Sequence, residues 1–165
     1  MLIPKLLVMM ERHLPARFIA VTATLMFAGV ALAQTAPVTG TWQMDAAKSH
    51  VADGRNVTLT VEMATTKVTV SSITQNKAGS ELNVAFTCTV DGKECEFAEG
   101  SHKSKVSMWF LGDALNICKT GGPAGDVVNQ WKLQPSADGT VLTLTVNHLE
   151  PTAADETLVF HKKGS

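Results

Sequence analysis

The most regular feature of the sequence is an alternation of apolar and polar side chains that recurs from residue 38 to the C-terminal end. In NVTLTVEM, residues 56–63, every second residue is apolar and the residues between them are mostly polar. A period of two is typical of β-strands that bury one face. The same pattern predicts strands in ELNVAFTCTV, TVLTLTVNHL and ETLVFHK, in the opening segment VTGTWQM, and less regularly in KVTVSSIT, SKVSMWFL, ALNICK and VVNQWKLQ.

Turn-forming residues separate these strands at short intervals, for example at Asp91-Gly92, Gly112-Asp113 and Asp138-Gly139. No segment beyond Gln34 shows a convincing helical period. About ten short strands with few long connections predict an all-β fold, and we expect an antiparallel up-and-down β-barrel of about 8–10 strands. A two-sheet β-sandwich is the alternative that the pattern leaves open.

One hairpin is predicted in detail, in FTCTVDGKECEF. Asp-Gly favours a two-residue turn of type I′. With Asp91-Gly92 at its tip, Cys88 faces Cys95 and Phe86 faces Phe97. A hydrogen-bonded antiparallel pair places its Cα atoms about 5.5 Å apart, which suits a disulfide. We therefore predict a Cys88–Cys95 disulfide within this hairpin.

The third cysteine, Cys118, is left without a partner by this pairing. Leu115 and Ile117 have the opposite parity, so the pattern does not decide which face Cys118 takes. It is either a buried, inert thiol or an exposed thiol that links two chains, and it also competes for Cys88 or Cys95. An unpaired edge strand is the other feature through which two chains could associate.

Residues 1–33 have the three parts of a cleavable signal peptide. The uncharged, largely apolar run 18–33 follows Arg12 and Arg17, and it ends in Ala-Leu-Ala. A retained membrane helix is the alternative, but this run is short for a hydrocarbon core of about 30 Å. We therefore expect a bacterial Sec-type export signal and a periplasmic or secreted protein. Since no Cys follows the cleavage site, we expect no lipoprotein anchor and no stable membrane anchor.

The segment MLIPKLLVM adds a second apolar patch before the charged residues, and a signal that began at Met10 would be more ordinary. We therefore hypothesise that translation starts at Met9 or Met10 rather than at Met1. Cleavage after residue 33 leaves 132 of the 165 residues. We assign residues 34–37 to a short linker and 38–163 to a single barrel domain, which is long enough to bury a core.

The charge of the remaining chain is slightly negative. Lys5, Arg12, Arg17 and Glu11 leave with the signal, so 11 of 14 basic and 14 of 15 acidic residues remain. No basic stripe is present, and we expect no nucleic-acid partner. Export to an oxidising compartment agrees with the predicted disulfide.

Gly40-Thr41-Trp42, on the first strand of a small all-β chain, resembles the Gly-x-Trp signature of lipocalins and of the wider calycin group of small ligand-binding barrels. The resemblance implies that Trp42 packs across the closed end of the barrel, under a basic side chain from the last strand. Lys162 and Lys163 are the candidates for that side chain. Physically, a barrel of about eight strands encloses one small ligand or its own side chains, and Gly40 lets strands approach closely.

Two stretches also resemble avidin-type barrels, VTGTW at residues 38–42 and NQWKL at residues 129–133. Avidins hold biotin with tyrosine and a set of hydroxyl groups, whereas this chain contains no Tyr. We therefore expect no biotin binding. The opening GTWQMDAAKS is similar to that of small exported bacterial proteins described as lipocalin-like, and this similarity implies a fold without an activity.

Strand parity selects the residues that would line a barrel interior. Asn129 and Trp131 share a face with Leu133, and His148 shares a face with Leu144. A pocket of mostly apolar residues with a few polar groups is typical of small-molecule sites. The candidate ligand-binding residues are therefore Phe86, Met108, Phe110, Asn129, Trp131 and His148. The competing interpretation places the aromatic residues in an ordinary core and the histidine at the barrel rim.

Catalytic and metal-binding patterns are missing from the sequence. It contains neither Gly-x-Ser-x-Gly nor His-Glu-x-x-His, and its histidines show no ligand spacing. We expect no catalytic residues, no metal, no cofactor and no enzymatic activity. The preferred function is an exported lipocalin-like barrel that binds a small apolar molecule. The alternative is a structural or interaction module whose barrel is filled by its own side chains.

Overall fold

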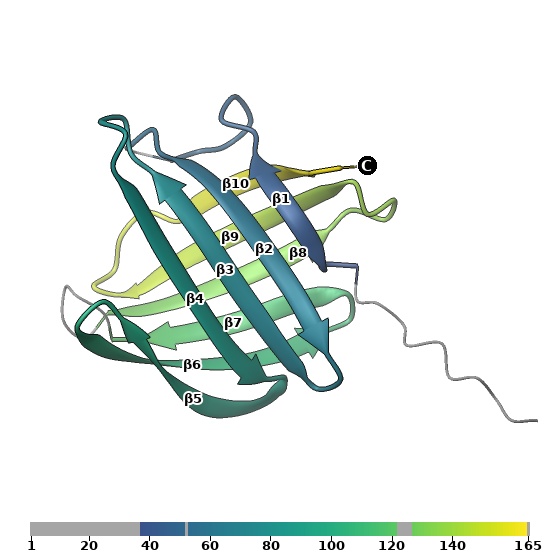
Figure 1. Ribbon diagram of the computed structural model, residues 1–165, viewed down its shortest axis with the longest axis vertical. Coiled ribbons are helices and arrows are strands. Elements are labelled where there is room, and N and C mark those ends of the chain that lie inside the picture. The colour runs from purple at the N-terminus through teal and green to yellow at the C-terminus, as the bar shows by residue number, and fades with distance from the viewer. Residues whose placement is uncertain (1–36, 52, 122–126, 165) are drawn as a thin grey trace, which may run out of the picture. The chain divides into compact units, whose positions relative to one another are not determined.

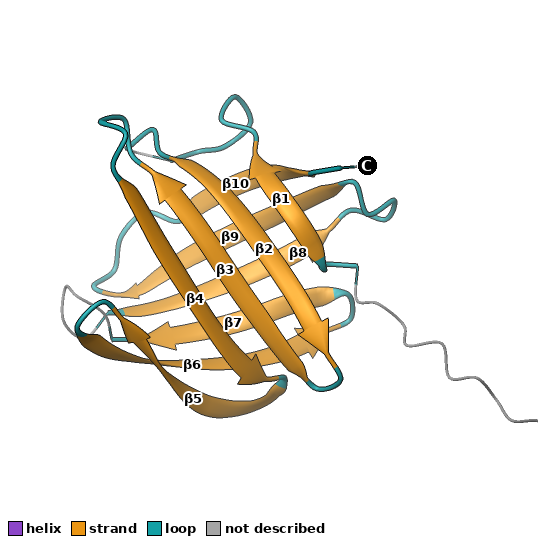
Figure 2. Cartoon of the chain, in the orientation of Figure 1, coloured by secondary structure: helices purple, strands orange, loops and turns teal. Residues whose placement is uncertain are grey.

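The computed structural model describes residues 37–51, 53–121 and 127–164. These residues form ten β-strands and, within those ranges, no helix (Figure 2). The strands are β1 (Gly40–Met44), β2 (Asn56–Ala64), β3 (Lys67–Gln75), β4 (Glu81–Thr89), β5 (Asp91–Glu99), β6 (His102–Leu111), β7 (Ala114–Thr120), β8 (Val128–Pro135), β9 (Val141–Glu150) and β10 (Glu156–Lys162).

Several expectations fall on the N-terminal segment. The signal peptide at 1–33, most of the linker at 34–37 and the choice of start among Met1, Met9 and Met10 lie outside the described residues. In the part of the chain that is described, no helix is long and apolar enough to cross a membrane.

All ten strands belong to one antiparallel sheet. Their order is β4-β3-β2-β1-β10-β9-β8-β7-β6-β5, so the first strand pairs with the last, with Trp42 opposite Lys162. The sheet curls into a nearly closed barrel (Figure 1). A single curled sheet excludes the β-sandwich alternative, and the prediction of an all-β, antiparallel, lipocalin-like barrel is confirmed.

The alternation in the sequence becomes the inner and outer faces of this sheet. On β9, Leu142, Leu144 and Val146 are buried and face the interior. Burying one such side chain contributes about 1.5–3 kcal/mol to stability. The outer face carries polar cross-strand pairs, such as the Thr69 and Thr87 hydroxyls at 2.8 Å. The side-chain period therefore determines both the strands and the face that each one buries.

An up-and-down barrel has two distinct ends. The loops β1–β2, β3–β4, β5–β6 and β9–β10 lie at one end, together with the end of β7 and the start of β8, and we call it the open end (Figure 1). The other four turns and the start of β1 lie at the opposite end, which we call the closed end. The residues that approach each end determine whether it is filled or hollow.

Trp42 fills the interior toward the closed end. Its side chain is 0% exposed, and its Nε1 donates a hydrogen bond of 2.9 Å to the carbonyl oxygen of Val38. Lys162 Nζ lies 5.2 Å from the centroid of the indole, within the range of a cation–π contact. Gly40, at φ +133°, leaves room for the lysine, because a Cβ there would come within 2.8 Å of Lys162 Cε. Of the two lysines that the lipocalin resemblance implies, Lys162 takes this position.

The barrel is interrupted between β4 and β5, which are the two edges of the sheet. The predicted hydrogen-bonded ladder between them is wrong, because β4 and β5 stand at opposite ends of the strand order, where β4 pairs with β3 alone and β5 with β6 alone. Asp91-Gly92 is a bulge inside β5, since the register against β6 shifts between Asp91 and Glu94 and Gly92 has φ +79°. A bulge bends its strand, and β5 diverges from β4 beyond their shared turn (Figure 1).

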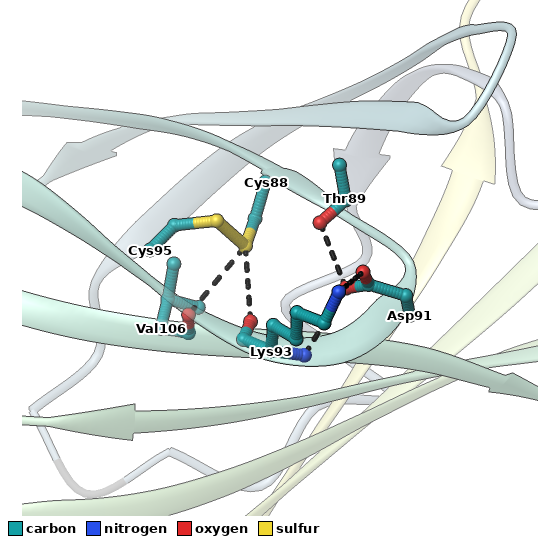
Figure 3. The surroundings of a disulfide bond; sticks show 6 residues. All are labelled: Cys88, Thr89, Asp91, Lys93, Cys95 and Val106. Atoms are coloured by element: carbon teal, nitrogen blue, oxygen red, sulfur yellow. Dashed lines mark hydrogen bonds and ion pairs between the residues drawn. A yellow bond between two sulfur atoms is a disulfide. The ribbon is translucent and has the colours of Figure 1, made fainter.

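Side chains close this gap, which we call the seam. Cys88 and Cys95 form a disulfide with their Cα atoms 5.7 Å apart, and the pairing is as predicted (Figure 3). Farther along, the rings of Phe86 and Phe97 pack with centroids 5.1 Å apart. The Cys88 sulfur lies 3.6 Å from the carbonyl oxygen of Val106, a packing contact, because a disulfide sulfur carries no hydrogen. The predicted side-chain pairs therefore form across a seam instead of a ladder.

The turn beside the disulfide holds an ionised carboxylate. Asp91 Oδ1 accepts hydrogen bonds from the Thr89 hydroxyl at 2.8 Å and from the Lys93 backbone N–H at 3.1 Å (Figure 3). These bonds, with that of Thr89 first, hold the pKa of Asp91 below its ordinary value of 3.8. The stabilisation is thus present above the unfolded pKa and is lost as the pH falls through the folded pKa.

We expect an NMR titration to give Asp91 a pKa below 3.8 in the native protein. In Thr89→Val the pKa should rise toward that value, because the hydroxyl donor is gone. Asp138 is the control in the same titration, because its hydrogen bonds are to Ser136 and Thr140 and Thr89→Val leaves them in place. An Asp91 pKa that does not change in Thr89→Val would contradict the assignment.

Candidate ligand-binding pocket

The barrel interior is hollow near the open end. An inner pocket of about 100 Å³ lies among strands β2, β3, β8, β9 and β10. Most of its lining is aliphatic and the remainder is polar or aromatic. The lining residues are Arg55, Val57, Leu59, Ser72, Thr74, Trp131, Leu144, Val146 and Leu158.

An outer pocket of about 340 Å³ adjoins the inner one. The two share Arg55, Ser72, Thr74 and Trp131, and we call them together the interior pocket. The outer part is also lined by Asp53, Leu82, Val84, Glu99 and Lys119. Its size falls within the range of about 300–1,000 Å³ that is usual for small-molecule sites.

The sequence makes this end hollow by changing the inward side chains of two strands. On β3 the inward residues change from Val68 and Val70 to the smaller and more polar Ser72 and Thr74. On β4 the inward parity continues to Leu82, which lines the outer pocket and is 58% exposed. A large apolar side chain that faces inward but remains in solvent is available for contact with an apolar ligand.

Arg55 lines both the inner and the outer part of the pocket, and its positive charge is paired with two carboxylates. Its guanidinium contacts Glu156 through Nη2 and Asp53 through Nη1, the latter at 3.0 Å. Burial by itself lowers the pKa of Arg55, but the hydrogen bonds to Glu156 and Asp53 outweigh it and raise that pKa above its ordinary value. Arg55 is therefore a permanent cation that already has two carboxylate partners.

A second ion pair forms part of the lining of the outer pocket. Lys119 Nζ lies 2.6 Å from Glu99 Oε2, and each side chain is only 11% exposed. The ammonium also lies 5.8 Å from the centroid of Phe97, at the seam. Ser104 donates a longer hydrogen bond, of 3.4 Å, to the same carboxylate oxygen. Both charges of this pair are thus compensated within the barrel.

Trp131 lines both parts of the interior pocket. Its ring packs on Phe86 with centroids 6.0 Å apart, which joins the pocket to the seam. Its Nε1 is buried, and no atom of the described residues accepts a hydrogen bond from it. Because the N–H is shielded from solvent, an acceptor would have to come from inside the barrel.

The structure brings some of the predicted ligand-binding residues to this pocket. Trp131 lines it, and Phe86 packs against Trp131 from the seam. Met108 is fully buried in the core and Phe110 packs against that core, and neither is among the lining residues. Asn129 and His148 face each other across β8 and β9.

His148 and Asn129 form a hydrogen bond with each other. His148 Nδ1 lies 2.8 Å from Asn129 Oδ1, and the two residues are opposite in the strand register. Neither belongs to the lining of the interior pocket. Ligand contact by Phe86, Met108, Phe110, Asn129, Trp131 and His148 stays a prediction.

Four charged residues of the pocket were missing from the sequence-based set, namely Asp53, Arg55, Glu99 and Lys119. Lys119 has the inward parity of Leu115 and Ile117 on β7, and Glu99 has the inward parity of Phe97 on β5. The alternation could therefore have identified both. Arg55 precedes β2 in a loop, where no periodicity applies, so the sequence carried no such signal for it.

Two further candidates from the sequence are the third cysteine and a metal-binding site. Cys118 is a free, partly buried cysteine on β7, with the parity opposite to that of Ile117. Its role in contact between chains stays a prediction. Within the described ranges, no three His, Cys, Asp or Glu side chains are grouped so that they could hold a metal ion.

The chain forms a single curled antiparallel sheet with a pocket inside one end. This is the fold of the lipocalin-like, or calycin-like, small β-barrels. No protein-family model and no curated protein sequence matches the chain.

Solved structures match it at low sequence identity. A secretory abundant heat soluble protein from Ramazzottius varieornatus has a TM-score of 0.59 at 10% identity, covering 78% of this chain and 97% of its own. The fatty-acid-binding protein of Manduca sexta has a TM-score of 0.52 at 15% identity, covering 75% and 98%. The zebrafish ileal bile acid-binding protein, complexed with cholic acid, has a TM-score of 0.51 at 15% identity, covering 76% and 98%. At these identities the similarity shows the fold alone.

Proposed function

We propose that this chain is an exported, non-enzymatic barrel that binds a small apolar molecule in its interior pocket. The observation that carries the proposal is the uneven filling of the barrel. Fully buried side chains such as Trp42 fill it toward the closed end, whereas about 340 Å³ is hollow at the open end. A barrel that served only as a rigid module would gain stability from filling that space with side chains.

The lining of the pocket supports an apolar ligand. Val57, Leu144, Val146 and Leu158 form the inner wall, and Leu82 stands exposed at the mouth. Two of the matching structures belong to proteins named for binding fatty acids and bile acids. Binding in the interior of this barrel is consistent with those names.

Export is the second part of the proposal. Its support is the signal-like segment at residues 1–33 and the disulfide between Cys88 and Cys95, because structural disulfides persist in oxidising compartments. The N-terminal residue of protein recovered from an expressing bacterial envelope tests it. A chain that begins at Gln34 supports export with cleavage, and a chain that retains residues 1–33 contradicts it.

Native mass spectrometry of the mature protein tests the ligand directly. We expect an additional mass on the native protein, or after exposure to an envelope lipid extract, which disappears on denaturation. Binding of N-phenyl-1-naphthylamine, a neutral apolar dye that fluoresces in apolar surroundings, gives a second readout. A bare protein that takes up neither an extract component nor the dye would overturn the proposal in favour of the interaction module.

Val146→Trp should abolish dye binding and leave the fold intact. Val146 is 7% exposed and lines the inner pocket, so an indole there would occupy most of its 100 Å³. The matched control is Thr145→Trp on the outer face of the same strand, which should keep the native affinity. We expect at least about a 10-fold loss of dye affinity, measured by fluorescence titration, in Val146→Trp alone. Equal affinities in the two variants would show that the dye does not occupy the inner pocket.

A further inference from the structure

We infer that the interior pocket selects neutral apolar molecules over those that carry a carboxylate, an inference that rests on the proposed function. This inference is based on the charged residues in the pocket. The two cations, Arg55 and Lys119, are each already paired with carboxylates of the protein. An additional carboxylate from a ligand would therefore find no unpaired counter-charge among the described lining residues.

The balance of charge around Arg55 opposes a ligand carboxylate. Its guanidinium has one positive charge, and both Glu156 and Asp53 contact it. A third carboxylate would have to displace one of them or lie within a few ångströms of both. Like charges at such a short distance repel each other, and more strongly in a partly buried site than in water. The guanidinium thus serves to hold the β1–β2 loop to β10 and is not free to hold an anion.

The ion pair of Lys119 with Glu99 also disfavours a ligand carboxylate. The Lys119 ammonium is 2.6 Å from Glu99 Oε2, and both side chains are largely removed from solvent. A ligand carboxylate at Lys119 would leave two carboxylates on one ammonium in a poorly hydrated site. Removing an ion from water without full compensation is costly. A neutral molecule incurs neither the repulsion nor this desolvation.

The rest of the pocket suits a neutral, mostly apolar molecule. Most of the inner lining is aliphatic, and the buried Trp131 N–H has no acceptor among the described residues. A hydroxyl or carbonyl oxygen inside the barrel could accept from it without introducing charge.

Three probes with the same chain length test the inference: decan-1-ol, decanoate and decyltrimethylammonium. In the unmodified protein at pH 7, decan-1-ol should bind about 10-fold more tightly than decanoate, measured by displacement of N-phenyl-1-naphthylamine. The cation should bind at least as well as decanoate, because it is not repelled by the carboxylates. Decanoate binding more tightly than decan-1-ol would overturn the inference and leave the proposed function standing. If the dye binds but none of the three probes displaces it, the inference fails alone, whereas a protein that does not bind the dye at all contradicts the proposed function as well.

Glu99→Gln provides a gain-of-binding test. The amide leaves Lys119 without its charge partner, so the affinity for decanoate relative to that for decan-1-ol should rise about 10-fold. Glu96→Gln is the matched control, because it removes the same charge from the exposed face of the same strand and should change neither affinity. Equal gains for decanoate in both variants would show a general charge effect and overturn the assignment to the pocket. The comparison of probes in the unmodified protein stands even if Glu99→Gln does not fold.

Discussion

Replacing Trp42 with Ala is expected to lower the free energy of unfolding by about 4 kcal/mol, in the range usual for truncating a large buried aromatic residue. The indole is 0% exposed, and its ring stands against Lys162 while its N–H bonds to Val38. Removing it takes away the largest fully buried side chain of the barrel and leaves the Val38 carbonyl without its donor. A loss of this size is a large fraction of the 5–15 kcal/mol typical of a domain.

Equilibrium denaturation in urea, followed by circular dichroism, measures this loss. Trp109→Ala is the matched control, because Trp109 lies on the outer face of β6 and is only partly buried. We expect the control to lose about 1 kcal/mol. Similar losses at the two positions would show that Trp42 is not the residue that fills the closed end.

Lys119→Met should cost about 3 kcal/mol of stability, because it leaves Glu99 charged, poorly exposed and without its partner. The double variant Lys119→Met/Glu99→Gln should recover much of that loss, since the uncompensated charge is gone. The reason is the asymmetry of buried ion pairs: breaking one is costly, whereas replacing both partners is often nearly neutral.

The exposed pair on the neighbouring strand provides the comparison. Lys105 Nζ lies 3.1 Å from Glu94 Oε2, but the two side chains are 51% and 60% exposed. Lys105→Met should change the free energy of unfolding by less than about 1 kcal/mol in the same urea titration. If Lys119→Met costs no more than Lys105→Met, water reaches Glu99 and the outer pocket is wetter than its geometry indicates.

The sequence predicted the strands because one physical rule determines them. Most inward positions, such as Leu144 or Val61, are apolar and most of their outward neighbours are polar, so the period of two marks both the extent and the face of the strand. The pairing of β1 with β10 could not be read from that rule. The lipocalin resemblance of Gly40-Thr41-Trp42 implied only that a basic side chain of the last strand lies over Trp42.

The seam was the part of the fold that local rules misjudged. Asp-Gly between two alternating segments is a strong hairpin signal, yet Asp91-Gly92 became a bulge because β5 pairs with β6. That choice depends on how the whole sheet curls, which no twelve-residue window contains. The disulfide prediction succeeded nevertheless, because side-chain parity brings Cys88 and Cys95 together in either arrangement.

The candidate pocket was predictable only on strands. Trp131 followed from its parity with Leu133, and the same reasoning applied to β7 would have given Lys119. Arg55 lies in a loop, and its position depends on the tertiary contact with Glu156 on β10, far away in the sequence. Met108 shows the converse limit, since parity shows that a residue faces inward but not whether the space beside it is filled.

The seam also bears on the risk of aggregation. A sheet edge with unpaired backbone groups can template the addition of a strand from another molecule, and a barrel avoids this only if it closes. Here the edges, β4 and β5, are held together by Cys88–Cys95 and by the rings of Phe86 and Phe97. The covalent link therefore protects two strand edges from neighbouring molecules, and a chain kept in a reducing environment would depend on the aromatic contact alone for that protection.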